Sequence, residues 1–335
     1  MKYLVTGATG FIGGCLAKQL VQSGHMVVAL VRNPEKATHL SSLGIKVHQG
    51  DITNLSSLRG PMTGVDGVFH LAAWYNIGTR DKRAAYHINV HGTQQVLEMA
   101  KDLNIPKIVY TSTLAVFSDT GGTLVDETFH HKGPWLSEYD RTKWIAHYEV
   151  AAPLAKAGLP LVIVQPGVVY GPNDTSAIGK ALNQYLKGKL PLTPAETAFC
   201  WAHVEDTAGA HLLAMEKGRL GESYIIAGPV HRFRAVFEIA ERITGIKAPS
   251  FHPTPKVMRT MAAGMKLLET VLPLPPPYTA ESLRVIAGTT YIGSNNKARQ
   301  ELGFNPRPLE EGLQETLLYE LHRMGLSDKN RLSRQ

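Results

Sequence analysis

A tyrosine and a lysine four residues apart, Tyr139 and Lys143, have the spacing in this chain that most directly suggests acid–base chemistry. On a helix, residues i and i+4 lie on the same face, so the phenol and the ammonium would be neighbours. A free phenol titrates near ~10 and is a poor base at neutral pH. A nearby ammonium stabilises the phenolate and brings its pKa toward the range in which acid–base catalysis is efficient. The pair predicts a tyrosine that exchanges a proton with a substrate oxygen.

Three consecutive hydroxyl side chains, Thr111, Ser112 and Thr113, follow the apolar run at 107–110. A hydroxyl can donate a hydrogen bond to a carbonyl oxygen. Each of the three is therefore a candidate for contact with a substrate oxygen.

A glycine-rich loop follows the first apolar run, with Gly7, Gly10 and Gly13 in the spacing GxxGxxG. Glycines allow a tight turn and let the backbone approach a pyrophosphate, and a helix N-terminus offers free N–H groups to the anion. The spacing differs from the commoner GxGxxG, and such a loop is a weak signal without its strand and helix. Here both are expected, so the loop predicts a dinucleotide site.

The residues after the second apolar run indicate which dinucleotide is bound. An acid there would bond a ribose hydroxyl, but the chain has Arg32 and, further on, Lys36. A guanidinium suits a 2′-phosphate through its paired N–H donors. We expect NADP(H) to be preferred, with NAD(H) possible.

The first half of the chain alternates short β-branched runs with helix-compatible segments. Nearly continuous apolar strands joined by helices are typical of a parallel sheet covered on both faces, so the predicted fold is an α/β, Rossmann-type doubly wound sheet. The runs lie at 3–5, 27–31, 45–47, 67–71, 107–110 and 161–164. After Pro166 this alternation ends. We expect a dinucleotide-binding domain over 1–165, with a return near 200–228, and a smaller mixed substrate-binding lobe over 166–325.

Composition narrows the function class. The 35 basic and 28 acidic residues give a net charge of +7, without the Lys/Arg blocks that favour nucleic-acid binding. The two cysteines, Cys15 and Cys200, lie far apart, and we expect no metal site, because the histidines lack ligand spacing. The segment 257–271 is amphipathic and contains charges, so we expect a lid helix rather than a membrane anchor. A cytoplasmic protein is expected.

Several motifs together make the chain resemble the extended short-chain dehydrogenases/reductases, also called the NAD-dependent epimerase/dehydratase family. The resemblance covers residues 1 to about 320. Its motifs are TGATGFIG at 6–13, GDI at 50–52, HLAA at 70–73, NVHGT at 89–93, YxxxK at 139–143, PGVVYGP at 166–172, WAHVED at 201–206 and ELGFNPR at 301–307. Within the family the chain looks most like the dihydroflavonol-4-reductase-like branch, and it is also similar to hopanoid-associated sugar epimerases.

The resemblance implies roles for individual residues. The catalytic set would be Thr113, Tyr139 and Lys143, with Ser112 as an alternative to Thr113, and Lys143 would also hold the nicotinamide ribose. Besides Tyr139 and Lys143, the cofactor would contact Gly7, Thr9, Gly10, Phe11, Ile12, Gly13, Arg32, Lys36, Asp51, Ile52, Leu71, Ala72, Ala73, Pro166 and Val168. The substrate would meet Thr113 and Tyr139 together with the aromatic residues Trp74, Tyr75 and Trp201. Asn89 is expected to support the active-site helix.

Two departures from the family pattern bear on the substrate. Dehydratases of this family carry Asp and Glu after the catalytic hydroxyl, where this chain has Leu114 and Ala115. Many sugar-nucleotide enzymes have Arg-x-x-Asn where this chain has Gln165 to Val168. We therefore expect a carbonyl compound or its alcohol that lacks a nucleotide diphosphate.

Three functions are compatible with these residues. The first is an NADP(H)-dependent reductase or dehydrogenase, the second is a sugar epimerase with the same catalytic residues, and the third is a non-catalytic dinucleotide sensor. An intact proton donor argues against the sensor. By analogy with relatives we expect a homodimer, a small-molecule substrate, and neither nucleic acid nor membrane as a partner.

Overall fold

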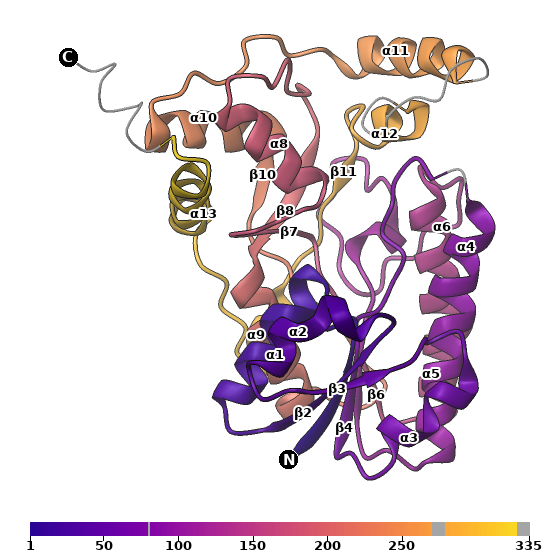
Figure 1. Cartoon of the computed structure of the whole chain (residues 1–335). Helices are drawn as coiled ribbons and strands as arrows, with labels where there is room; N and C mark the ends of the chain where they lie inside the picture. Colours follow the sequence, from indigo (N-terminus) through magenta and orange to yellow (C-terminus); the bar gives the residue numbers. More distant parts are fainter. Residues whose placement is uncertain (80, 270–278, 327–335) are drawn as a thin grey trace.

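The computed structural model describes residues 1–79, 81–269 and 279–326. Its centre is a seven-stranded sheet in the order β3-β2-β1-β4-β5-β6-β9 (Figure 1). Every neighbouring pair in this sheet is parallel. The strands are β1 (Lys2–Thr6), β2 (Met26–Val31), β3 (Lys46–Gln49), β4 (Gly67–His70), β5 (Ile108–Thr111), β6 (Leu161–Gln165) and β9 (Ser223–Ile225). The strand order reverses between β1 and β4, and ligands of such sheets bind at the carboxyl ends beside this reversal.

The strands are apolar on both sides because helices cover both faces of the sheet. One core joins the sheet to α1 (Phe11–Gln22), α9 (Val204–Lys217) and the π-helical turn η7 (Ala298–Leu302). The other core joins it to α3 (Arg59–Met62), α5 (Thr93–Asp102) and α7 (Ala152–Lys156). Alternate residues of β5 enter opposite cores: Val109 lies in the first, and Ile108 and Tyr110 lie in the second. This alternation decides which helix each later side chain of the strand faces.

Two long helical runs lie along the second face, and each contains a π-helical turn. The first is α4 (Lys82–Tyr86), η3 (His87–Gly92) and α5, and the second is α6 (Glu138–Ile145), η5 (Ala146–Ala151) and α7. Short helices elsewhere are η1 (Pro34–Ala37), α2 (Thr38–Ser41), η2 (Leu55–Ser57) and η4 (Leu114–Phe117).

A smaller mixed sheet forms the C-terminal lobe. Its strands are β7 (Val168–Tyr170), β8 (Ala198–His203), β10 (Val230–Arg232) and β11 (Thr290–Tyr291), and only the β8–β10 pair is antiparallel. The lobe's helices are α8 (Ala177–Leu186), α10 (Phe233–Thr244), α11 (Pro255–Leu268), α12 (Ala280–Val285) and α13 (Leu309–Arg323). An aromatic and aliphatic core holds α8, α10 and α13 against β8.

The predicted fold class is confirmed. All six predicted apolar runs form strands, and β9 returns from the later half of the chain to pair with β6. The expected helix at 257–271 forms as α11, while its last two residues lie outside the described residues. In the described part of the chain, no helix is long and apolar enough to cross a membrane.

Candidate active site

Tyr139 and Lys143 lie on α6, whose first turn is capped by Ser137 through the backbone N–H of Asp140. The Lys143 side chain is 2% exposed, and its ammonium donates to the Thr111 carbonyl oxygen at 2.8 Å and to the Tyr110 hydroxyl at 3.1 Å. Burial lowers the pKa of Lys143 to about 7. Burial raises the pKa of Tyr139, so its phenol is protonated at neutral pH. The predicted helical pair is present and is held close to the end of β5.

The three hydroxyls at the end of β5 have three different partners. Thr111 is hydrogen-bonded to His211 of α9, and the buried Ser112 is hydrogen-bonded to His147 of η5 at 2.8 Å. Thr113 is hydrogen-bonded to Tyr139, which partly offsets the rise in the pKa of that phenol. Because Ser112 is turned to His147, Thr113 is the hydroxyl of the three that lies beside the tyrosine.

Aromatic side chains stand beside Tyr139. The Tyr75 ring meets the Tyr139 ring edge to face, with 4.9 Å between centroids. Tyr75 is 52% exposed, and burial, the largest cause, raises the pKa of its hydroxyl to about 12. Asn89 accepts from the Trp74 backbone N–H and donates to the Trp74 carbonyl oxygen and to Thr142 of α6. Asn89 therefore fixes the Trp74–Tyr75 segment against the helix that carries Tyr139.

Trp201 is not brought to this group. It is 1% exposed, packs in the aromatic core of the C-terminal lobe, and donates its indole N–H to the His231 carbonyl oxygen. The predicted contact of Trp201 with a substrate has no support in this geometry, because β8 directs the ring into the core. By contrast, the Trp74 indole N–H is buried and has no acceptor among the described residues.

The glycine loop fits a pyrophosphate. Gly7 has φ +76°, and a Cβ there would lie 2.7 Å from the backbone nitrogen of Ala72. Helix α1 starts after Gly10 with no side-chain cap and no acid in its first turn. Its first N–H groups are therefore available to an anion, as a dinucleotide phosphate requires. Thr9 and Gly10 are exposed at this end of the helix, whereas Gly13 packs against the loop itself.

Most of the other predicted cofactor residues follow strands of the seven-stranded sheet at the same carboxyl edge, whereas Val168 belongs to the smaller sheet. Arg32 and Lys36 are found just after β2, with Arg32 exposed. Asp51 follows β3 and accepts from the Thr53 backbone N–H, while Ile52 is buried against Gly92. Pro166 accepts from the Leu114 N–H, and Val168 belongs to β7, where it pairs with Trp201 of β8.

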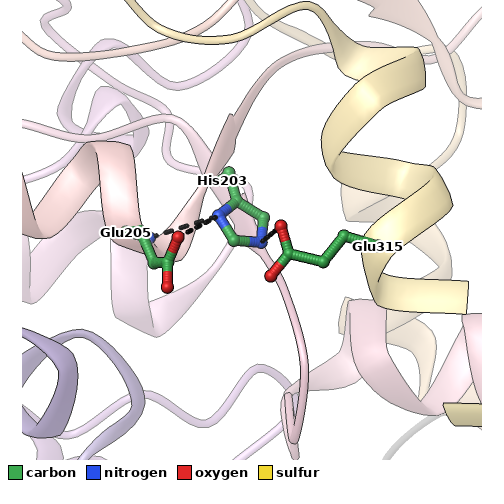
Figure 2. Close-up of side chains that lie close together, drawn as sticks. All are labelled: His203, Glu205 and Glu315. Carbon is green, nitrogen blue, oxygen red and sulfur yellow. Dashed lines mark hydrogen bonds and ion pairs between the residues drawn. The ribbon is translucent and has the colours of Figure 1, made fainter. Parts of the chain in front are cut away.

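A separate charged cluster brings His203, Glu205 and Glu315 together (Figure 2). Their ligand atoms lie within 4.8 Å of one another. Arg307 already pairs with Glu315 at 2.9 Å and with Glu205 at 3.0 Å, so a divalent cation would have to compete with a guanidinium. Arg307 also pairs with Asp206 at 2.9 Å, and His203 accepts from the Glu205 backbone N–H at the start of α9. The cluster joins α9 to the segment before α13 by ion pairs, which is a structural role.

Sequence reasoning missed two buried groups near Tyr139. The Tyr110 hydroxyl accepts a hydrogen bond from Lys143 of α6. Tyr110 and Ile108 are two residues apart on one strand and so lie on the same face of the sheet, a signal that the sequence does contain. Asp140 accepts from Ser137 of the preceding turn and from Tyr291 of β11. No spacing in the sequence indicates the Tyr291 contact, because the two residues are 151 positions apart.

Comparisons with known proteins indicate one protein family. Residues 3–227 match the model of the NAD dependent epimerase/dehydratase family. A "putative dihydroflavonol 4-reductase" of Synechocystis is 30% identical over 319 residues, covering 93% of this chain and 92% of that protein. "Sterol demethylase protein B" of Methylococcus capsulatus is 28% identical and covers 91% and 94%. Among solved structures, gox2253 has a TM-score of 0.83 at 29% identity, covering 97% of this chain and 98% of that one.

Proposed function

Since the chain belongs to the NAD-dependent epimerase/dehydratase family, we propose that it is an NADP(H)-dependent oxidoreductase that reduces a ketone or aldehyde, or oxidises the corresponding alcohol. The observation that carries the proposal is the grouping of Thr113 and Tyr139, with Lys143 on the same helix and buried beside the end of β5. A phenol, a hydroxyl and an ammonium so placed can bind a carbonyl oxygen and protonate it.

Each side chain has one task in the reductive direction. Thr113 donates a hydrogen bond to the substrate oxygen, and Tyr139 donates the proton that this oxygen needs once it becomes an alkoxide. When bound, the reduced nicotinamide supplies the hydride for the carbonyl carbon. The products would then be the alcohol, the oxidised nicotinamide and the Tyr139 phenolate. Lys143 stabilises that phenolate and contacts the nicotinamide ribose.

The surroundings favour a substrate with an apolar body. Tyr75 is half exposed and presents ring surface beside Tyr139, whereas Leu114, directly after Thr113, is buried in a core with Val116 and Phe117 and gives that segment no polar side chain. Ligand pockets are commonly lined by such apolar and aromatic groups. Relatives that cover most of the chain support the same class, since their names include a dihydroflavonol 4-reductase and a farnesyl-dihydroquinoline-oxide ketoreductase.

The direct test is a screen of hydrophobic ketones and aldehydes with NADPH and with NADH, followed at the nicotinamide absorbance. We expect turnover with at least one hydrophobic ketone and a preference for NADPH. If no carbonyl in a broad panel is reduced and no alcohol is oxidised, the proposed reaction is wrong.

Calorimetry with UDP- and dTDP-sugars on the NADP-loaded protein tests the substrate class separately. We expect no binding, because Val168 and Gln165 replace the Asn and Arg that many sugar-nucleotide enzymes carry at these positions. Micromolar binding of either sugar nucleotide would favour an epimerase instead.

A further inference from the structure

A line of buried polar side chains runs from Lys143 to the start of the glycine loop. Its members come from five different elements of the nucleotide-binding half, and each is at most 2% exposed. In order they are Lys143 of α6, Tyr110 of β5, Thr93 of α5, His70 of β4 and Thr6 of β1.

Neighbouring members of this line interact through their polar atoms. The Lys143 ammonium lies 3.1 Å from the Tyr110 hydroxyl, and the Thr93 side chain interacts with that hydroxyl and partly offsets the rise in the pKa of Tyr110 that burial causes. The Thr93 hydroxyl lies 3.1 Å from His70 Nε2, and His70 Nδ1 lies 2.7 Å from the Thr6 hydroxyl. The Thr6 hydroxyl also accepts from two backbone N–H groups at the end of β4, both at 3.2 Å.

The protons that each group can donate determine the direction of the hydrogen bonds along this line. An ammonium can only donate, so Tyr110 must accept from Lys143. At the other end, the two backbone N–H groups occupy both lone pairs of the Thr6 hydroxyl, so Thr6 donates its proton to His70 Nδ1. The imidazole proton is then on Nε2 and is donated to the Thr93 hydroxyl. This scheme requires a neutral imidazole, and burial provides it by lowering the pKa of His70 to about 3.

Few neighbouring groups stabilise the charged form of the Lys143 side chain. Burial disfavours the ammonium, and the ionisable groups around it are Tyr139 on its own helix, Tyr110 on β5, His70 on β4 and His147 on η5. Both histidines are held neutral by burial, since the pKa of each is lowered to about 3. Within the described residues, the ammonium donates to the Thr111 carbonyl oxygen and to the Tyr110 hydroxyl, and it also lies 4.8 Å from the Tyr110 ring centroid.

We propose that Tyr110 is a positioning residue that keeps Lys143 charged and aligned beneath Tyr139, with Thr93 and His70 orienting the Tyr110 hydroxyl toward that task. The consequence for catalysis rests on the proposed function, because Lys143 must be charged to stabilise the Tyr139 phenolate. The contact itself does not depend on which substrate is reduced.

The test measures the titration of Lys143 in the full-length protein by NMR of lysine labelled with ¹³C at the ε carbon. Lys143→Arg identifies the signal by its loss. In Tyr110→Phe we expect the titration midpoint of Lys143 to fall by about one pH unit, a tenfold change in its protonation equilibrium, because the charged form loses an acceptor. Tyr185→Phe is the matched control: Tyr185 is also 1% exposed, and its hydroxyl donates to the Ile246 carbonyl oxygen far from α6. We expect no shift of Lys143 in that variant.

A midpoint in Tyr110→Phe within a few tenths of a pH unit of the native value would overturn the proposal. If Tyr110→Phe does not fold, Thr93→Val provides the second test, because it keeps the Lys143–Tyr110 contact and removes the partner that orients the hydroxyl. We expect a smaller downward shift in Thr93→Val, and no shift would overturn the proposal.

The titration separates this inference from the proposed function because it needs no substrate. A shifted Lys143 in a protein that reduces no carbonyl would support the role of Tyr110 and contradict the proposed reaction. If the protein does turn over, the limb of the kcat–pH profile that reports Lys143 should move by the same amount in Tyr110→Phe, and an unmoved limb would show that Tyr110 has only a packing role.

Discussion

Burial shifts the pKa values of Tyr139 and Lys143 in opposite directions. It raises the pKa of Tyr139, so the phenol is protonated at neutral pH, the state that the proposed reduction requires. Burial also lowers the pKa of Lys143 to about 7, which makes the charge of this lysine sensitive to pH in the physiological range. The two groups are tuned in opposite directions by the same burial, because burial disfavours whichever form carries charge.

Replacing Tyr139 by Phe tests the proton donor. We expect Tyr139→Phe to lower kcat by about 10²–10⁴-fold, the usual contribution of a general acid, while NADPH affinity measured by calorimetry changes little. Tyr148→Phe is a suitable control, since Tyr148 is on the same helical run and its hydroxyl donates to the Phe129 carbonyl oxygen instead. A Tyr139→Phe protein that keeps more than about a tenth of the native kcat would remove Tyr139 from the mechanism.

Replacing Arg32 by Ala tests the choice of cofactor. We expect Arg32→Ala to weaken NADPH binding by roughly 1.5–3 kcal/mol, the range for hydrogen bonds to charged groups, and to leave NADH binding nearly unchanged. The physical reason is that only the 2′-phosphate presents a charge to the exposed end of β2. Binding constants for both cofactors are compared with those of Arg234→Ala, an exposed arginine of α10 that pairs with Glu238. Equal losses for NADPH and NADH would make Arg32 structural, and a native preference for NADH would contradict the idea directly.

At the scale of elements, α6 connects the two sheets. One side of the helix carries Tyr139 and Lys143, and Asp140 on another side accepts from Tyr291 of β11 at 2.8 Å. Asp140 also accepts from Ser137 and Ser118, so a single buried carboxyl ties α6 to β11 and to the segment after η4. The placement of Tyr139 therefore depends on the C-terminal lobe as well as on the nucleotide-binding sheet.

Asp140→Asn should change how stability depends on pH. Burial raises the pKa of Asp140 to about 7, above the ordinary value of 3.8, so its contribution to stability is complete below about 4 and is lost as the pH rises through 7. Asparagine does not titrate, so the variant does not lose this contribution as the pH rises. Between pH 5 and pH 8, the free energy of unfolding of Asp140→Asn, measured with denaturant, should therefore increase relative to that of the native protein. The gain should be about 1.4 kcal/mol for each pH unit over which the carboxyl is ionised in the unfolded chain and protonated in the folded one.

The exposed Asp126 provides the control for that measurement. Its pKa is lowered by the Thr128 hydroxyl, so it stays ionised from pH 5 to pH 8, and Asp126→Asn should differ from the native protein by the same amount at both ends. If Asp140→Asn behaves in the same way, Asp140 is already ionised at pH 5 and the pKa argument is wrong.

At the scale of the whole molecule, we expect buried histidines to make the fold sensitive to acid. Among the described residues, three of the four buried histidines with a lowered pKa lie in the nucleotide-binding half, the fourth being His203 of β8. Burial lowers the pKa of His70 and His147 to about 3 and that of His211 to about 4. Their contribution is complete above the unfolded value of 6.5 and is lost as the pH falls from there toward the folded values. The three come from β4, η5 and α9, so protonation should weaken the nucleotide-binding half as a unit.

We expect the melting temperature of the native protein to fall steadily from pH 7 to pH 4, and His147→Gln to show a shallower fall. Glutamine can keep a hydrogen bond to Ser112 without gaining a charge. His39→Gln, at an exposed position of α2, should retain the native slope. Scanning calorimetry measures the melting temperature of the three proteins at each pH. If the melting temperature falls with the same slope in all three, the buried imidazoles do not control the response to acid.

Much of the framework could be predicted from the sequence because it depends on residues close together in the chain. The apolar runs predicted the six strands, the glycine loop predicted a strand–turn–helix, and the spacing of Tyr139 and Lys143 predicted a shared helix face. Helix and strand periodicity act over a few residues, so the sequence contains this information directly.

The tertiary structure decided which side chains meet. The family resemblance implied Thr113 and left Ser112 as an alternative, and the end of β5 turns Ser112 to His147 and Thr113 to Tyr139. Trp201 and Tyr75 were both candidate substrate contacts, and the lobe core encloses the first while the second stays half exposed. The line from Lys143 to Thr6 joins residues that are far apart in the chain, and no local pattern marks it. Such contacts form only when parallel strands bring their carboxyl ends to one edge, because that geometry depends on strand order rather than on sequence spacing.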